Sequence, residues 1–423
     1  MSAKPRRIEP LTLLIGVSMT IGYGTLYYPF AILGPEIARA QGWSNSFVFG
    51  VFSVALLTSA ATASVVGHAM DRFGARPVMV VGSFFATCVL VNLSFVETMV
   101  GFAVAMLLIE FAARMVQYET GFAALTALHG RNARRPIAHV TLVAGFASTV
   151  FWPLIHWLLG FMDWRGVFLV LAAINFLVAL PIHMLVPNRP ELRAADRNDE
   201  PEPQTASAAG LVAQPLRDPG LLQPGRRMPA FLLLSLAFAG GSFLMSAVHT
   251  SFFLILDQMG RAAALAALAG AVIGPMQVAA RLIEMVTGER VASSMVGLIS
   301  TGTLFLGIVI LAAGLWFDAD LVIIAFAVSF GIGQGLNFIA RAILPARLFG
   351  TDGYGAMTGK LATIRLFAMA GAPFCTALAL THAGIGITFA MLIGIAAVSV
   401  AASWALWGIE RRCGSAQALA SAQ

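Results

Sequence analysis

Charged side chains are scarce in this 423-residue chain: Asp, Glu, Lys and Arg together make up 11% of it, whereas hydrophobic residues make up 59%. A soluble globular domain usually carries about 25% charged residues. The composition, with a mean hydropathy of +0.85, therefore excludes an ordinary soluble protein and indicates an integral protein of a lipid bilayer. The net charge of +6 does not indicate nucleic-acid binding, because the basic residues are scattered over short segments.

Cysteine is nearly absent as well. The chain has only Cys88, Cys375 and Cys413, two in apolar runs and one in the C-terminal tail, and this odd, small set implies no disulfide framework. The glycine-rich phosphate loop of ATP-driven pumps is missing, as are the Cys and His spacings of metal sites and the filter repeats of channels. Without a soluble domain large enough for catalysis, we expect neither an enzyme nor a cofactor or metal.

What the chain does contain is long apolar runs. A membrane helix needs about 20 apolar residues, and twelve runs reach that length. The first is too long for a signal peptide, whose apolar core has about 7–15 residues, so we expect it to be retained as a helix. The expected spans lie near residues 11–36, 46–68, 77–96, 98–127, 137–160, 166–187, 229–256, 262–287, 292–316, 319–346, 357–380 and 384–408.

One polar stretch divides these spans into two sets of six. Residues 188–228 are rich in Arg, Asp, Glu and Pro and show no apolar periodicity, which predicts a solvated linker. We therefore expect an N-terminal six-helix bundle over 1–187, a cytoplasmic linker over 188–228, and a C-terminal six-helix bundle with its tail over 229–423. The predicted fold class is an all-α membrane protein of twelve transmembrane helices in two bundles.

The basic residues predict the orientation. If the N-terminus lies inside, about nineteen Lys and Arg residues fall in cytoplasmic segments and about three fall outside, namely Arg39, Arg165 and Arg261. This is the positive-inside pattern. It predicts a multi-pass protein of a bacterial-type cell inner membrane with both termini in the cytoplasm, and it places Asp318 and Asp320 outside.

A charged turn joins the second and third expected spans, where Gly67 is followed by Asp71-Arg72-Phe73-Gly74-Ala75-Arg76. A turn with this many charged residues cannot lie in lipid. It must therefore be a tight connection between two helices. The pattern Gly-x-x-x-Asp-Arg-x-Gly-x-Arg resembles the cytoplasmic loop signature of the major facilitator superfamily of transporters. The resemblance covers essentially the whole chain, and it implies a carrier of small molecules in which Gly67, Asp71, Arg72, Gly74 and Arg76 form a conformational loop.

A weaker copy of this pattern stands in the second half of the chain, at Ala280, Glu284, Gly288 and Arg290. It predicts a parallel repeat of two bundles that rock against each other to give alternating access.

Four arginines lie inside expected spans: Arg114, Arg281, Arg341 and Arg365. A charge at the centre of a membrane helix costs about 2.5–3.5 kcal/mol, so it must face the protein interior or water. Arg341 is within two turns of the cytoplasmic end, which favours a side chain that snorkels to the interface. For Arg365 the structural and the functional interpretation remain equally open.

Arg114 shares a helix face with Glu110 and Tyr118. One interpretation is an intrahelical Glu110–Arg114 pair that neutralises both charges, and the other is that the pair lines a transport cavity. Arg114-Met115-Val116-Gln117 also resembles the Arg-x-x-Gln start of a span-four motif of proton/drug antiporters, in which the arginine serves proton movement. The glycine that follows in that motif is replaced here by Tyr118.

Arg281 follows Gln277 by four residues on one face of the eighth span. The placement Gln277-x-x-x-Arg281 resembles the Asp/Asn-x-x-x-Arg of monocarboxylate transporters, the branch that includes oxalate–formate antiporters, where the arginine binds the substrate carboxylate. That resemblance implies polar substrate contacts at Tyr118 and His249, and bulky aromatic residues including Tyr28 could close around an apolar tail. The alternative is a structural Arg281 that belongs to the loop repeat.

The sequence therefore predicts a secondary transporter, expected to be a monomer, that moves a small organic anion together with a proton. Proton coupling could fall to Glu110, Glu119 or Glu284, with Arg114 as a further candidate. The alternative is a proton-driven efflux carrier for drugs or other toxic solutes.

Overall fold

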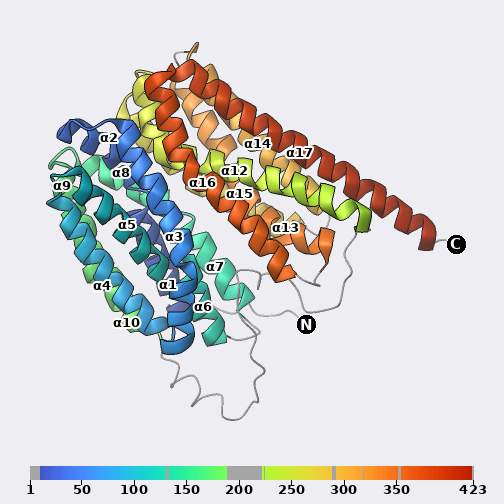
Figure 1. Cartoon of the computed structure of the whole chain (residues 1–423), viewed down its shortest axis with the longest axis horizontal. Helices are drawn as coiled ribbons and strands as arrows, with labels where there is room; N and C mark the ends of the chain where they lie inside the picture. Colours follow the sequence, from blue (N-terminus) through green and yellow to red (C-terminus); the bar gives the residue numbers. More distant parts are fainter. Residues whose placement is uncertain are drawn as a thin grey trace, which may run out of the picture. The chain divides into compact units, whose positions relative to one another are not determined.

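In the computed structural model the chain folds into helices that account for nearly all of the residues described, which are 10–129, 133–187, 222, 224–287, 292–317, 319–350 and 354–421. Within these ranges, twelve helical stretches are long and apolar enough to cross a membrane. The expected all-α membrane fold with twelve spans is confirmed (Figure 1).

The chain divides into two compact units, Met1–Trp43 with Val54–Ala208 and Ser44–Ser53 with Ala209–Gln423. The helices of the first half of the chain are α1 Pro10–Leu26, α2 Phe30–Gln41, α3 Asn45–Phe73, α4 Ala75–Ser94, α5 Met99–Val116, α6 Tyr118–His129, α7 Arg134–Ala144, α8 Ala147–Leu158, α9 Trp164–Ile174, the π-helix η2 Asn175–Ala179 and α10 Leu180–Met184. Those of the second half are α12 Pro224–Gln258, α13 Ala263–Thr287, α14 Ser293–Ala313, α15 Asp320–Phe349, α16 Tyr354–His382 and α17 Gly384–Ser421. The expected linker falls almost wholly outside the described residues.

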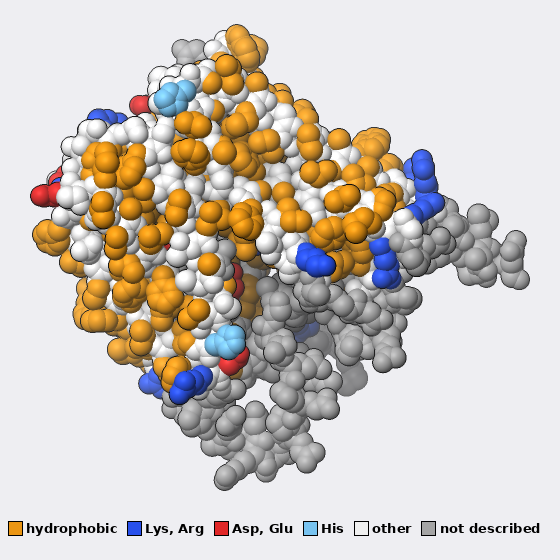
Figure 2. Space-filling model, viewed as in Figure 1, with side chains coloured by type: hydrophobic (Ala, Val, Ile, Leu, Met, Phe, Trp, Pro, Cys, Tyr) orange, Lys and Arg blue, Asp and Glu red, His pale blue; other side chains and the backbone are white. Residues whose placement is uncertain are grey.

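The surface of both units suits a lipid environment. Large apolar side chains stand exposed on many helices, such as Val100 at 73%, Ile283 at 64% and Trp404 at 62%. Figure 2 shows hydrophobic side chains spread over the described surface, with few charged ones among them. A soluble monomer rarely exposes contiguous apolar surface on this scale, so these faces are expected to meet acyl chains.

The helices of the first unit pack mainly through α4, which lies against α5, α9 and α10, and through α1, which lies against α7. Polar side chains fix where two of these helices begin. Thr98 accepts a hydrogen bond from the backbone N–H of Gly101 at the start of α5, and Asp163 accepts one from Gly166 at the start of α9, each at 3.0 Å. Such caps satisfy N–H groups that have no partner within the helix.

The charged turn after the second span is tighter than a loop. Asp71 and Arg72 lie in the last turn of α3, Arg76 lies in the first turn of α4, and Gly74 alone separates the two helices. Its φ of +89° is open to glycine and strained for other residues. The charged motif therefore spans the ends of two helices that are joined by a single residue, Gly74.

In the second unit, α15 packs closely against α13 and α14, and α12 packs against α16 and α17 (Figure 1). Glycines bring α15 and α13 together. A Cβ atom on Gly331 would lie 2.7 Å from the carbonyl oxygen of Ile273, and one on Gly335 would overlap the carbonyl oxygen of Gln277. Close approach through small residues is a common way for membrane helices to associate, and here it fixes the part of α13 that carries Gln277 and Arg281.

Candidate functional site

Four of the six spans in the first half of the chain are interrupted near their middle. The interruptions are the turn at residues 27–29 between α1 and α2, Gln117 between α5 and α6, residues 145–146 between α7 and α8, and the π-helix η2 after α9. Each described span in the second half is one continuous helix. Irregular backbone at membrane depth occurs only where protein or water covers it, and broken or π-bulged helices often mark binding sites.

Aromatic side chains gather at these interruptions in a continuous row. The row consists of Phe122, Tyr118, Tyr23, Tyr27, Tyr28 and Trp152, with neighbouring ring centroids 4.7–6.5 Å apart. It contains four of the five tyrosines in the chain, and each of these four is half-buried. Tyrosine combines a broad apolar face with a hydroxyl group, so the aromatic row can meet both water and the apolar part of a solute.

The break in α1 is held by one end of this row. The indole N–H of Trp152 donates to the backbone oxygen of Tyr28 at 3.0 Å, and the ring of Tyr28 meets the ring of Trp152 edge-on, with centroids 5.6 Å apart. The bond uses a carbonyl group beside the point where the helix is interrupted. Trp152 is fully buried and anchors the half-buried tyrosines of the row to the core of the unit.

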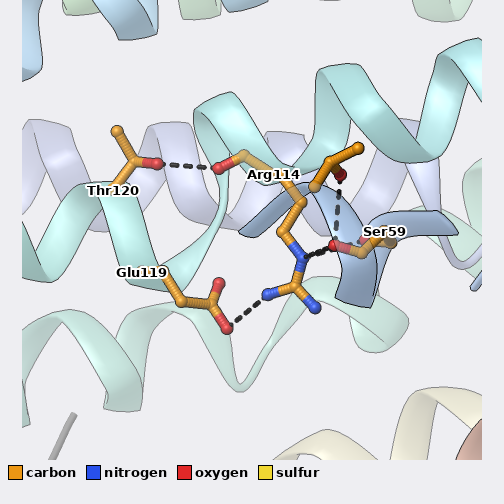
Figure 3. A network of polar contacts seen from close by, with 5 residues as sticks. Ser59, Arg114, Glu119 and Thr120 are labelled. Atoms are coloured by element: carbon orange, nitrogen blue, oxygen red, sulfur yellow. Dashed lines mark hydrogen bonds and ion pairs between the residues drawn. The ribbon is translucent and has the colours of Figure 1, made fainter. Parts of the chain in front are cut away.

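Arg114 lies next to the other end of the row and is held by three groups (Figure 3). Its Nε donates to the backbone oxygen and to the hydroxyl of Ser59, both at 2.9 Å. Its NH1 forms an ion pair with Glu119 at 2.7 Å. In the part of the chain that the structure describes, this ion pair replaces the intrahelical pair with Glu110 that the sequence spacing allows.

The break at Gln117 explains that exchange of partners. Glu119 is five residues beyond Arg114, and in an unbroken helix it would point about 140° away. Because α5 ends at Val116 and α6 begins at Tyr118, Glu119 reaches the guanidinium instead. The hydroxyl of Thr120 crosses the same break and donates to the backbone oxygen of Arg114 at 2.7 Å.

The π-helix in the sixth span presents a buried amide. Asn175 donates through Nδ2 to the hydroxyl of Thr25 at 2.6 Å and to the backbone oxygen of Leu171 at 3.1 Å. Both polar side chains are buried, at 1% exposed. They join the π-helix to α1, two residues before the interruption of that span begins.

In the second unit, Arg281 is only 5% exposed, as is Gln277. The guanidinium carbon of Arg281 lies 4.6 Å from the ring centroid of Phe338 on α15, and that of Arg341 lies 5.1 Å from the same ring. Arginine over an aromatic face is an attractive arrangement. The half-buried Glu284 follows Arg281 by three residues on α13.

His249 on α12 is also buried, at 7% exposed. Its Nε2 donates to the side-chain oxygen of Gln334 on α15 at 3.0 Å. This bond connects a residue expected from the sequence to one that the sequence did not indicate.

The residues expected from the sequence thus fall into two groups, each described within its own unit. Tyr28, Glu110, Arg114, Tyr118 and Glu119 belong to the first unit, and His249, Gln277, Arg281 and Glu284 belong to the second. Sequence reasoning missed Ser59, Tyr23, Trp152, Asn175 and Gln334. Asn175 and Gln334 could have been found as isolated amides within apolar spans, whereas Ser59 and Tyr23 gain importance only from their spatial neighbours.

Within the described residues, twelve apolar helical spans with buried polar groups at mid-span define a polytopic membrane protein. Residues 12–373 match the Major Facilitator Superfamily. The chain belongs to that family and is therefore a transporter rather than an enzyme.

Solved structures agree with the fold. The crystal structure of the nucleoside transporter NupG is similar with a TM-score of 0.66 and 14% identity, over 94% of this chain and 98% of that one. The bacterial homolog of the human lysosomal transporter Spinster, in an inward-facing and occupied conformation, has a TM-score of 0.64 and 14% identity, over 97% of this chain and 98% of that one. No curated protein sequence matches the chain.

Proposed function

We propose that this transporter moves a small organic anion, a monocarboxylate, together with a proton across the cell inner membrane by alternating access. The observation that carries the proposal is Arg281, a guanidinium only 5% exposed on a membrane-spanning helix. Such a charge is poorly screened, so a carboxylate is attracted to it strongly. The planar fork of an arginine also matches the two oxygens of a carboxylate.

Neighbouring polar groups support a role in recognition. The amide of Gln277 lies one turn before Arg281 and is buried with it. The hydrogen-bonded pair of His249 and Gln334 supplies further donors and acceptors on α12 and α15. We also propose Tyr118 and Tyr28 of the aromatic row as substrate-contacting residues of the first unit.

The test is transport of L-lactate by the purified protein in proteoliposomes. Uptake should be driven by an inward proton gradient and should collapse with an uncoupler. Arg281→Ala should abolish uptake, and Arg281→Lys should weaken it strongly, because lysine keeps the charge but loses the two-pronged geometry. Arg341→Lys is a matched control, because Arg341 contacts the same Phe338 ring but is assigned to the membrane–water interface. This variant should keep lactate uptake. Saturable lactate uptake that survives Arg281→Ala would end the assignment.

The second candidate is a proton-driven efflux carrier for drugs or other toxic solutes. The aromatic row favours it, because half-buried tyrosines can bind large apolar solutes, and so does the Arg114-x-x-Gln117 pattern. In this case an inward proton gradient should expel solute, and the preferred solutes should be larger and need not be acids.

The membrane orientation and the oligomeric state of the transporter are also proposed. We propose both termini and the linker on the cytoplasmic side, from the distribution of basic residues, and a monomer as the working unit.

A further inference from the structure

Glu110 is a carboxyl group buried inside the first unit. It is 4% exposed and lies in α5, in the middle of a membrane span. Its side chain hydrogen-bonds with Ser59, while its Oε1 has no hydrogen-bond partner among the described residues. A carboxylate in such a place is costly unless a positive charge accompanies it. Glu110 therefore needs either a bound proton or a cation beside it.

The cation is within reach but engaged elsewhere. Arg114 is one turn further along the same helix face, the spacing at which a glutamate and an arginine can pair. In this structure its NH1 is bonded to Glu119, and its Nε is bonded to Ser59. Ser59 thus contacts both members of the unformed pair.

We propose that Glu110 is the group that takes up the transported proton and that Arg114 changes partner with it, a role that rests on the proton coupling of the proposed function. When Glu110 holds the proton, Arg114 pairs with Glu119. When Glu110 releases the proton, its carboxylate draws Arg114 away, and Glu119 turns to water. Arg114 stays protonated throughout, so the charge that changes is the one on Glu110. When the proton leaves Glu110, Arg114 moves to pair with the carboxylate.

Exposure separates the three glutamates that the sequence left equal. The side chain of Glu119 is 53% exposed, so water can solvate its charge when Arg114 departs. Glu284 is half-buried on α13 and belongs to the second unit. Of the three glutamates, Glu110 is the one whose negative charge most requires a partner. Besides Ser59, Arg114 lies one turn away and can serve as that partner.

The exchange acts on the interrupted span. Arg114 precedes the break at Gln117 and Glu119 follows it, so their ion pair bridges α5 and α6. After the exchange, the bond from Thr120 to the backbone oxygen of Arg114 remains as a link across the break. Proton release would therefore loosen α6, which carries Tyr118 of the aromatic row, from α5.

The surroundings of Glu110 contain few other titratable groups. Within the described residues, Arg114 on its own helix is the charged group that acts on it directly. Glu119 from α6 and Tyr23 from α1 interact electrostatically with Arg114. They affect Glu110 only indirectly, through Arg114. Ser59 on α3 provides the hydroxyl group that interacts with Glu110.

Infrared spectroscopy of the purified protein in lipid, recorded over a pH series, tests this without a substrate. The wild type should show a protonated-carboxyl band that Glu110→Gln removes. Glu119→Gln frees Arg114 for Glu110, so the same band should vanish at lower pH, with a proton affinity at least about tenfold weaker, one pH unit. Glu284→Gln is the control and should leave the band unchanged. A wild type without the Glu110 band, or a Glu119→Gln protein that titrates like the wild type, overturns the proposal.

Transport provides the second arm. With L-lactate inside and outside the proteoliposomes, Glu110→Gln should keep exchange but lose accumulation driven by a proton gradient. Ser59→Ala removes only a hydroxyl group that contacts Glu110 and Arg114. It should therefore weaken accumulation less than Glu110→Gln does. Retained gradient-driven accumulation in Glu110→Gln overturns the proposal. If lactate is not carried at all, the proposed function fails, while the infrared titration still decides whether Glu110 and Arg114 exchange partners.

Discussion

Replacement of Gly331 by alanine measures how much the second unit depends on the close contact of α15 with α13. The added Cβ would lie 2.7 Å from the backbone oxygen of Ile273 and 2.8 Å from Cβ of Met276. Carbon atoms prefer about 3.5–4.0 Å, so the two helices must separate locally by roughly 0.7 Å. Neither contact belongs to the flexible end of a side chain, so the backbone itself has to move. Such overpacking usually costs about 1–3 kcal/mol.

The matched control is Gly394→Ala in α17, where an added Cβ meets nothing within 4 Å. Both variants gain the same helix propensity, up to about 1 kcal/mol, so the difference between them reports the clash alone. Thermal unfolding in detergent, followed by tryptophan fluorescence, should show Gly331→Ala melting below the wild type and Gly394→Ala melting at or above it. Gly335→Ala should resemble Gly331→Ala, since its Cβ would overlap the backbone oxygen of Gln277.

The same contact positions Arg281, which follows Met276 on α13 by just over one turn. We therefore expect Gly331→Ala to reduce lactate uptake even in protein that remains folded at the assay temperature. Equal melting temperatures for Gly331→Ala and Gly394→Ala would refute the reasoning, because they would show that α13 and α15 have room for a methyl group between them.

Three further outcomes are expected. Asp71→Asn should leave expression near normal but greatly reduce transport, because it removes a charge from the last turn of α3, next to the joint at Gly74; normal transport would exclude a conformational role. In a background without the native cysteines, a cysteine within 190–225 should be protected in intact cells and Leu321→Cys should react with an impermeant reagent, and the reverse would overturn the orientation. Asn175→Ala should lower the unfolding free energy by about 1–2 kcal/mol, since it leaves Thr25 without its amide donor; a Thr25→Val, Asn175→Leu double variant that is just as unstable would show that the bond is not the cause.

The membrane class, the twelve spans and the tight turn at Gly74 could be predicted from the sequence. A bilayer demands about 20 consecutive apolar residues for each crossing and excludes charged turns from its interior, so these features are decided by local composition. The buried position of Arg281 followed in the same way, since a membrane span leaves a charged side chain few alternatives to the protein interior, and Gln277 shares its helix face.

The interruptions of the spans were not predictable from local composition. Residues 98–127 read as one apolar helix, yet the structure breaks it at Gln117. Gly82 on α4 allows a close approach there, since its Cβ would clash with Met115, while a Cβ on Gly22 of α1 would make an ordinary contact, 3.5 Å from the backbone oxygen of Val116. These contacts come from α4 and α1, far away in the sequence.

The partner of Arg114 was decided in the same way. Helical spacing favoured Glu110, four residues before it, because residues four apart share a face in a regular helix. The break turns Glu119 toward the guanidinium instead, and Ser59 on α3 occupies the other side of it. Composition and periodicity specify which residues enter the membrane, but which of them meet depends on the packing of helices whose contacts are not local in the sequence.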